Sequence, residues 1–379
     1  TANGTTLGGD NGVAVALMLM VLDDDEIEHP PVECVFTTEE EVGLNGAKAL
    51  DKSVLKARTM INMDSEDEGV ATVSCAGGLR VQFTKEIQRT TVRGSLLTLK
   101  VEGLLGGHSG QDIDKERQNA DLLMARMIQR LLKETKGQLV SFNGGTKDNA
   151  IPRECEASLI YESDEEAAKA EELACELAET YAEELTPAEP DFSCEISCET
   201  NRTAEAIPQD AAKEFICAMR LAPNGIQKRN IKMDGFVVVS LNLGVVRTEE
   251  DRIVMIFSPR SSVASLQEDT KERLNTLAET FGFTVSHSSE YPGWSFKEDS
   301  PVREICKESY KELFGEDLKI EAIHAGLECG LFSDAIKGLD AIAIGPTIAN
   351  CHTPDEYLTL DSFERFYEFL KDILSRLAK

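Results

Sequence analysis

Short apolar runs alternate with helical repeats at both ends of the chain. Residues 13–22 (VAVALMLMVL) predict a helix, and residues 32–38 (VECVFTT) and 58–65 (RTMINMDS) predict short strands that end in acids. The same alternation returns near the C-terminus, with helices predicted at 301–314 and 361–378. Strands that alternate with helices predict an α/β domain, in which a mixed, mostly parallel sheet lies between two layers of helices.

The middle of the chain follows a different pattern. Between residues 79 and 294 the strands are longer and alternate apolar with polar residues, as in residues 235–261. Amphipathic helices are predicted there at 119–135, 164–185 and 266–281. These spacings suit split βαβ units. We therefore expect an inserted α+β domain that is ferredoxin-like and large enough to be doubled.

Charge and hydropathy exclude several classes of function. The 379 residues include 39 basic and 68 acidic side chains, and the formal net charge of -29 would repel nucleic acid and anionic lipid. No apolar run approaches the roughly 18 residues of a spanning helix, and the first residues have no signal-peptide pattern. We therefore expect a soluble cytoplasmic protein that binds neither nucleic acid nor membranes.

Candidate chemistry recurs in one form, an acid or histidine in a loop marked by glycine or proline. The instances are Asp10 in LGGDNG, Glu40 and Glu41 in TTEEEVG, Asp64 in NMDSE, and His352 in GPTIANCHTPDE. Open α/β sheets bind ligands at the carboxyl ends of their strands, so we expect these residues to meet at one rim. Carboxylates gathered there would raise one another's pKa unless a cation neutralised them.

This set of side chains suits a metal centre. Mixed Asp, Glu and His ligands fit zinc, with manganese or cobalt as substitutes, and several carboxylates fit two ions that share a ligand. Adjacent glutamates can divide the work, because one can bind metal while the other takes a proton from a metal-activated water. Taken singly, each motif is more often a helix cap or turn residue. Their shared context favours a site.

Eight motifs in a fixed order then carry a family resemblance. They are LGGDNG, TTEEEVGLNGA, INMDSE, GGHSG, NAIPRE, YPGW, HAGLECGLF and IGPTIANCHTPDE. The chain resembles the dizinc aminopeptidase and carboxypeptidase clan that includes peptidase T, peptidase V and carboxypeptidase G. Within it the chain is most similar to the bacterial aminoacyl-histidine dipeptidases, or peptidase D. The resemblance extends over essentially the whole chain.

The resemblance implies roles for the rim residues. Asp10 would bridge two zinc ions and precede a strained peptide bond, and Glu40 would be the general base. Glu41 and His352 would complete the first metal site, and Asp64 would belong to the second. The family's remaining ligand is a histidine in a His-x-Asp segment before the bridging Asp, and no residue here matches it. We therefore expect that the sequence lacks the N-terminal part of its catalytic domain.

The resemblance also implies a division of the chain. Residues 1–78 and 295–379 would form the discontinuous metal-binding catalytic domain, truncated at its N-terminus. Residues 79–294 would form an inserted lid or dimerisation domain, through which the protein could form a homodimer.

Four further residues are candidates for contact with substrate. His108 in LLGGHSGQD could donate a hydrogen bond to a developing oxyanion, and a structural role is the alternative. His324 in HAGLECG fits a binding role and a structural role equally well. Asn149 in DNAIPRE and Arg260 in SPRSS are expected to bind substrate, since a guanidinium can hold a terminal carboxylate bidentately. The alternative for Arg260 is an ion pair with one of the many acids.

The leading hypothesis is a metallo-dipeptidase that hydrolyses Xaa-His dipeptides such as β-alanyl-histidine (carnosine). One alternative is an amidohydrolase of the same family that acts on N-acyl amino acids. Another is a non-catalytic relative that uses the cleft for binding. The sequence leaves open the preferred side chain of the substrate, the native metal and the oligomeric state.

Overall fold

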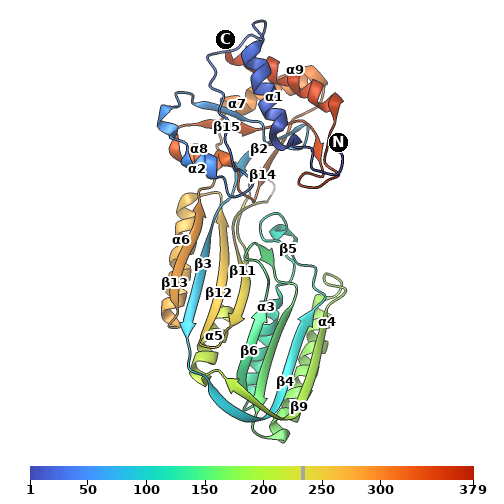
Figure 1. Ribbon diagram of the computed structural model, residues 1–379, viewed down its shortest axis with the longest axis vertical. Coiled ribbons are helices and arrows are strands. Elements are labelled where there is room, and N and C mark those ends of the chain that lie inside the picture. The colour runs from blue at the N-terminus through green and yellow to red at the C-terminus, as the bar shows by residue number, and fades with distance from the viewer. Residues whose placement is uncertain (232–234) are drawn as a thin grey trace. The chain divides into compact units, whose positions relative to one another are not determined.

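The computed structural model describes residues 1–231 and 235–379, and the chain divides into two compact units. Unit 1 combines Thr1–Gly77 with Tyr291–Lys379, and unit 2 is Gly78–Glu290. The sequence pattern put these boundaries after residues 78 and 294. Figure 1 shows the blue N-terminal and red C-terminal segments within the same unit. In the described residues, no helix has the length and apolar character needed to cross a membrane.

Unit 1 is built on a small mixed sheet. Among the described residues its four strands have the order β1-β15-β2-β14. β1 runs parallel to β15 and β14 runs parallel to β2, whereas β15 and β2 meet antiparallel. The elements are α1 (Gly9–Asp23), α2 (Asn45–Ala49), β1 (Thr59–Asn62), β2 (Val70–Cys75), α7 (Pro301–Phe314), β14 (Lys319–Ile323), α8 (Glu328–Ala335), β15 (Asp340–Ala343), β16 (Ile348–Ala349), β17 (Tyr357–Leu358) and α9 (Leu360–Leu377). This mixed α/β architecture agrees with the predicted fold class.

The helices of unit 1 form where local signals predict them. α7 starts behind a capping Ser300, whose hydroxyl accepts from the Arg303 N–H, and Pro301 occupies its first position. Gly315, with φ of 76°, ends it in the left-handed conformation that glycine adopts without strain. α9 buries one apolar stripe, including Phe366 and Phe369, and leaves its charged face to solvent.

The strand predicted at 32–38 is the main error in the predicted fold. The structure has no strand there, because among the described residues no backbone hydrogen bond pairs residues 32–37 with a neighbour. β1 is likewise paired on one side only, and both segments line a cavity of about 730 Å³. An extended, β-branched run becomes a strand only when a second strand pairs with it.

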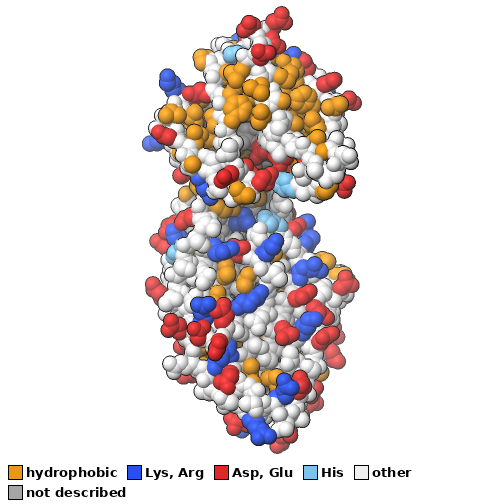
Figure 2. Space-filling view, in the orientation of Figure 1, with side chains coloured by type: hydrophobic (Ala, Val, Ile, Leu, Met, Phe, Trp, Pro, Cys, Tyr) orange, Lys and Arg blue, Asp and Glu red, His pale blue; other side chains and the backbone are white. Residues whose placement is uncertain are grey.

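Unit 1 also exposes apolar surface near this cavity. α1 is apolar on all sides, so a helix that packs on one side only must leave part of that surface in water. Leu19 on α1 is 54 % exposed, and Phe36 in the unpaired segment is 48 % exposed. Figure 2 shows hydrophobic side chains gathered on this face of the unit.

Unit 2 is a large sheet with helices packed against it. In the described residues its strands run in the order β13-β3-β12-β11-β6-β8-β4-β9, with β10 paired to β11. Its elements are β3 (Gly77–Glu86), β4 (Thr90–Glu102), β5 (Gly107–His108), α3 (Ala120–Glu134), β6 (Gln138–Gly144), β7 (Ala150–Ile151), β8 (Cys155–Tyr161), α4 (Asp164–Leu185), β9 (Ser193–Ala206), α5 (Gln209–Leu221), β10 (Gly225–Asn230), β11 (Phe236–Thr248), β12 (Arg252–Ser261), α6 (Ala264–Thr280) and β13 (Thr284–Tyr291).

One continuous core holds unit 2 together. It joins strand residues such as Phe83 and Phe257 to helix residues such as Met124 and Phe215, all fully buried. The predicted helix at 164–185 is α4 with the same bounds. α3 and α6 begin and end within two residues of the predicted helices.

Candidate metal centre and substrate-binding residues

The loops of unit 1 bring the predicted rim residues together. Asp10 lies at the start of α1, where Asp10 and Asn11 have non-helical backbone angles and their shared peptide bond is cis. Asp64 follows β1, and His352 lies in the loop between β16 and β17. Glu41 lies in the turn that leads to α2. Each side chain therefore projects from a loop, a turn or the first residues of a helix, and none from the middle of a regular element.

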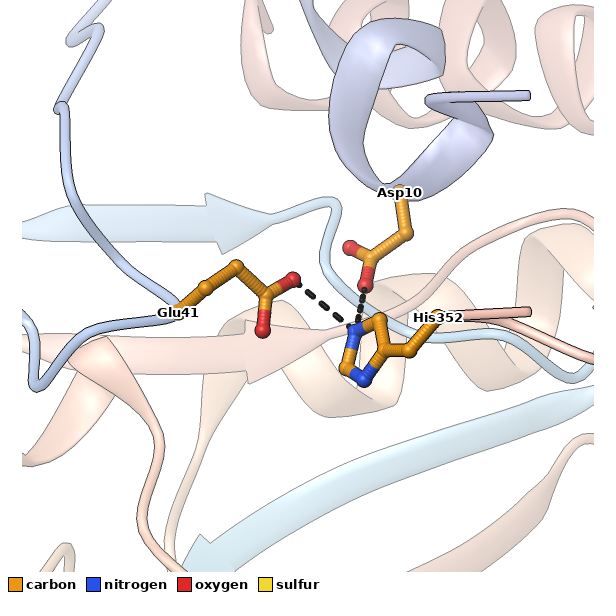
Figure 3. A group of neighbouring side chains, drawn as sticks. All are labelled: Asp10, Glu41 and His352. Atoms are coloured by element: carbon orange, nitrogen blue, oxygen red, sulfur yellow. Dashed lines mark hydrogen bonds and ion pairs between the residues drawn. The ribbon is translucent and has the colours of Figure 1, made fainter. Parts of the chain in front are cut away.

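Three of these side chains meet at one point (Figure 3). His352 Nε2 lies 3.1 Å from Asp10 Oδ2 and 2.9 Å from Glu41 Oε1. One ligand atom of each residue lies within 4.8 Å of those of the other two. The His352 and Glu41 side chains are 63 % and 55 % exposed, so solvent reaches the cluster. Two carboxylates and one imidazole form a donor set that fits zinc with an open coordination position.

Asn11 connects this cluster to Asp64. Its side-chain nitrogen donates to Asp64 Oδ1 at 3.0 Å and to the Met63 carbonyl at 2.9 Å. Its side-chain oxygen accepts from the Ala14 N–H at 3.0 Å. This one amide therefore links the start of α1 to the loop after β1, which holds Asp64 next to the residue that follows Asp10.

Two acids near the cluster, Asp64 and Glu40, have raised pKa values. Burial, followed by the charges of Asp10 and Glu40, raises the pKa of Asp64 to about 7. Burial also raises the pKa of Glu40, and the neighbouring Glu41 and Glu328 carboxylates add to the effect. The pKa of His352 is raised by its hydrogen bond to Asp10 and by the Glu41 charge. Repulsion among carboxylates was expected, but burial is the larger cause. A cation bound here would relieve both.

Sequence reasoning missed several residues close to the cluster. Ligand atoms of Glu66 and Cys351 lie within 4.8 Å of one another and of an Asp10 ligand atom. Burial and the adjacent Glu66 raise the pKa of Cys351 to about 12, which keeps its thiol protonated at neutral pH. This second group contains no imidazole, and its thiol must lose a proton before it can bind a metal. Both residues lie within quoted motifs, Glu66 in INMDSE and Cys351 in IGPTIANCHTPDE, and this was the sequence signal for them.

The chain matches a known protein family. The model of Peptidase family M20/M25/M40 matches residues 1–376. The chain belongs to this family. Its members are metal-dependent peptidases, and the Asp10, Glu41 and His352 cluster is a group of side chains that could hold an ion. The family resemblance inferred from the eight motifs is therefore confirmed.

Individual relatives agree with the family match. This M20-family chain is 35% identical over 382 residues to the cytosol non-specific dipeptidase of Escherichia coli (strain K12), which covers 99% of the chain and 78% of the relative. The crystal structure of aminoacylhistidine dipeptidase from Vibrio alginolyticus superposes with a TM-score of 0.95 at 35% identity, over 99% of this chain and 77% of that one. Aminopeptidase PepT from Bacillus cereus shares the fold, with a TM-score of 0.50 at 16% identity over 99% and 72% of the two chains.

Three predicted substrate-binding residues lie in unit 2. β5 pairs with β7 so that His108 faces Ala150, and the Ser109 N–H donates to the Asn149 carbonyl at 2.9 Å. Burial lowers the pKa of His108, and the positive charge of Arg260 lowers it further. His108 and Arg260 are therefore close enough to interact, and Asn149 lies on the strand connection beside His108.

Two backbone hydrogen bonds also fix the tautomer of His108. Its Nδ1 accepts the backbone N–H groups of Gly110 and Gln111, at 3.3 Å and 3.0 Å. A neutral imidazole that accepts at Nδ1 carries its proton on Nε2. His108 therefore offers an Nε2–H donor, and its lowered pKa keeps the ring neutral at pH 7.

The remaining candidate, His324, lies in unit 1. It follows β14 directly and is 7 % exposed. Four residues further along, Glu328 accepts a hydrogen bond from Thr37 Oγ at 2.8 Å, and burial raises its pKa. Glu328 lines the same cavity as Asp10 and Asp64 and was not predicted, although it lies in the quoted motif HAGLECG.

Proposed function

We propose that this chain acts as a zinc-dependent dipeptidase that hydrolyses Xaa-His dipeptides, β-alanyl-histidine among them. The observation that carries the proposal is the convergence of Asp10, Glu41 and His352, whose ligand atoms lie within 4.8 Å of one another. Family membership and two relatives named as dipeptidases, each 35% identical over nearly the whole chain, support the reaction class. The name of the Vibrio relative supports an aminoacyl-histidine substrate.

In this proposal Asp10, Glu41 and His352 hold one zinc ion, and Asp10 and Asp64 contribute to a second. When bound, zinc polarises the scissile carbonyl and lowers the pKa of a water towards about 7. Manganese or cobalt would serve the same ligands. A bound cation would favour the ionised forms of Glu40 and Asp64, whose pKa values are raised.

Glu40 acts as the general base. It is adjacent in sequence to Glu41, and its pKa is raised first by burial and then by the Glu41 charge. A raised pKa makes the carboxylate a better proton acceptor, which suits it to take the proton of the attacking water and pass it to the leaving amine. Glu39 has a different task, because its carboxylate accepts from the Asn45 side chain at 3.0 Å.

In this proposal, residues of unit 2 bind the substrate and stabilise the oxyanion. The neutral His108 donates from Nε2 to the oxyanion that forms during attack, and Arg260 pairs with the terminal carboxylate of the dipeptide. Asn149 hydrogen-bonds the substrate backbone, and His324 of unit 1 is the fourth binding residue. The fixed Nδ1 acceptor bonds of His108 and its interaction with Arg260 support this assignment.

We also propose that two copies associate through unit 2. β9 ends the large sheet and, in the described part of the chain, is paired to β4 alone along its 14 residues. A long strand with one free edge can pair with the same strand of a second copy. Light scattering at several protein concentrations tests this, and a monomer at all of them contradicts it.

The substrate assignment is tested by comparing two substrates. Zinc-loaded protein should release histidine from β-alanyl-histidine and leave N-acetyl-histidine almost untouched. Preferential cleavage of the N-acetyl compound would replace the dipeptidase assignment with an amidohydrolase. Absence of turnover on both, in protein that binds zinc, would favour a binding role for the cleft.

A further inference from the structure

One buried acid near the candidate metal centre has no part in the chemistry described above. Glu356 closes the motif CHTPDE, four residues after His352, and is only 2 % exposed. In the described residues no lysine, arginine or histidine forms an ion pair with it. Burial of a lone carboxylate is costly unless hydrogen bonds replace its hydration.

Backbone N–H groups of one loop replace that hydration. Glu356 Oε2 accepts from the N–H groups of Leu7 and Gly8 at 2.6 Å and 3.0 Å. Glu356 Oε1 accepts from those of Gly9 and Asp10 at 2.7 Å and 3.2 Å. One carboxylate thus binds four consecutive N–H groups, and the last belongs to the candidate metal ligand Asp10.

The backbone of Glu356 belongs to the same loop as the candidate ligand His352. Its own N–H donates to the Thr353 carbonyl at 3.2 Å, and the Thr353 N–H donates to the Asn350 carbonyl at 3.3 Å. His352 lies inside this turn. Glu356 therefore joins two loops more than 340 residues apart in sequence, and each loop carries one of the side chains that meet at 3.1 Å.

We propose that Glu356 is a positioning residue, which fixes the Leu7–Asp10 loop against the His352 turn so that the Asp10 carboxylate and the His352 imidazole are preorganised for one cation. That a cation binds here depends on the proposed function. The link between the two loops is independent of it, because it follows from the four hydrogen bonds. Groups that hold metal ligands in place typically change metal affinity or activity by about 10–100-fold when removed.

The decisive variant is Glu356→Gln in the full chain. Glutamine keeps the shape but has one acceptor oxygen, and its NH₂ group would face two backbone donors. We expect zinc affinity, measured by competition with a chelator, to fall about 10–100-fold. Turnover of β-alanyl-histidine should fall with little change in KM. In metal-free protein, amide hydrogen exchange of residues 7–10 should accelerate.

Glu189→Gln is the matched control. Glu189 is 3 % exposed and accepts the N–H groups of Leu105 and Gln118 at 2.7 Å and 2.8 Å, but it does so in unit 2. Its replacement removes a comparable buried acceptor, so zinc affinity should stay within about twofold of wild type. A similar loss in both variants would mean that general destabilisation causes the effect, and would overturn the positioning role.

A second pair of variants tests the same contact from the other side. A Cβ at Gly9 would lie 3.1 Å from Glu356 Oε1, whereas one at Gly12 meets nothing within 4 Å. Gly9→Ala should therefore weaken zinc binding about 3–10-fold, a part of the loss expected for the carboxylate itself, and Gly12→Ala should not. These variants keep the test open if Glu356→Gln does not fold.

The outcomes separate this inference from the proposed function. If His352→Ala abolishes zinc binding while Glu356→Gln and Gly9→Ala bind zinc like wild type, the positioning role is wrong and the metal site stands. If His352→Ala also binds zinc like wild type, the proposed metal site is wrong, and the positioning role fails with it.

Discussion

The two units of the chain present opposite electrostatic environments. In unit 1, several acids gather around the histidine His352, and burial followed by neighbouring carboxylates raises the pKa values of Glu40 and Asp64. In unit 2, burial lowers the pKa of His108, and the positive charge of Arg260 lowers it further. Raised acid pKa values mark a place where a cation is stabilising, and a lowered histidine pKa beside an arginine marks one where an anion is stabilising.

This contrast matters for the proposed peptidase, because its metal is a cation and the terminal carboxylate of its dipeptide substrate is an anion. In the proposed function the two tasks fall to different units, since the acids of unit 1 project from loops around a small sheet and His108 is held by a short strand pair of unit 2. The predictions below test each half of this contrast, in order of expected effect.

The largest effect is expected from removing the imidazole of the metal centre. His352→Ala leaves two carboxylates, which hold zinc poorly, so we expect zinc stoichiometry to fall and turnover of β-alanyl-histidine to drop below detection. Plasma emission spectroscopy and an amino-acid release assay measure the two quantities. His287→Ala is the control, because His287 is exposed on β13. Full zinc occupancy in His352→Ala would contradict the cation half of the contrast.

Replacing the adjacent residues Glu40 and Glu41 should affect different quantities, turnover alone in one case and zinc content as well in the other. Glu40→Gln removes the proposed base and should lower kcat by roughly 10²–10⁴ while zinc stays bound. Glu41→Gln removes a proposed ligand, so its zinc stoichiometry should fall as well. Zinc analysis beside steady-state kinetics separates the two. If Glu40→Gln keeps near wild-type kcat, another residue is the base.

A smaller effect is expected from replacing His108 in unit 2, the proposed donor to the oxyanion. His108→Ala removes an Nε2–H donor and should lower kcat by about 10²–10³ with zinc content unchanged. His108→Gln, whose amide can still donate, should recover part of the loss. An unchanged kcat in His108→Ala would show that its hydrogen bonds to Gly110 and Gln111 serve the fold alone.

The smallest effect concerns a buried acid of unit 2 that lies outside any acidic cluster. Burial raises the pKa of Asp121 to about 8, with no neighbouring acid among the causes. Folding then favours the protonated form, so the contribution of Asp121 to stability is greatest below about pH 4 and is lost as the pH rises towards 8. Asp121→Asn should remove this dependence, which is expected to be on the order of 1–3 kcal/mol.

Urea unfolding of the full chain at pH 5 and pH 8 measures the effect. Asp114→Asn, at an exposed position of the same unit, is the control. Because no other acid contributes to the shift of Asp121, zinc should leave its pH dependence unchanged. If adding zinc changed the pH dependence contributed by Asp121, the electrostatic environments of units 1 and 2 would not be independent.

Much of this protein could be predicted without its structure. The family follows from eight motifs in order, and the fold class follows from the alternation of strands and helices. Helix bounds such as those of α4 were predictable because capping and apolar periodicity act within a few residues. The residues of the candidate metal centre were chosen by the same local logic, an acid or histidine in a loop after an apolar run.

Tertiary structure decided whatever depends on a distant partner. Residues 32–37 have the composition of a strand but are not one, because backbone pairing needs a second strand beside them. Nothing in the sequence assigns a partner to Glu356, yet its carboxylate accepts from the N–H groups at positions 7–10. Composition and periodicity report which conformations a segment can adopt, whereas hydrogen bonds between segments hundreds of residues apart select the one it has and determine what surrounds each carboxylate.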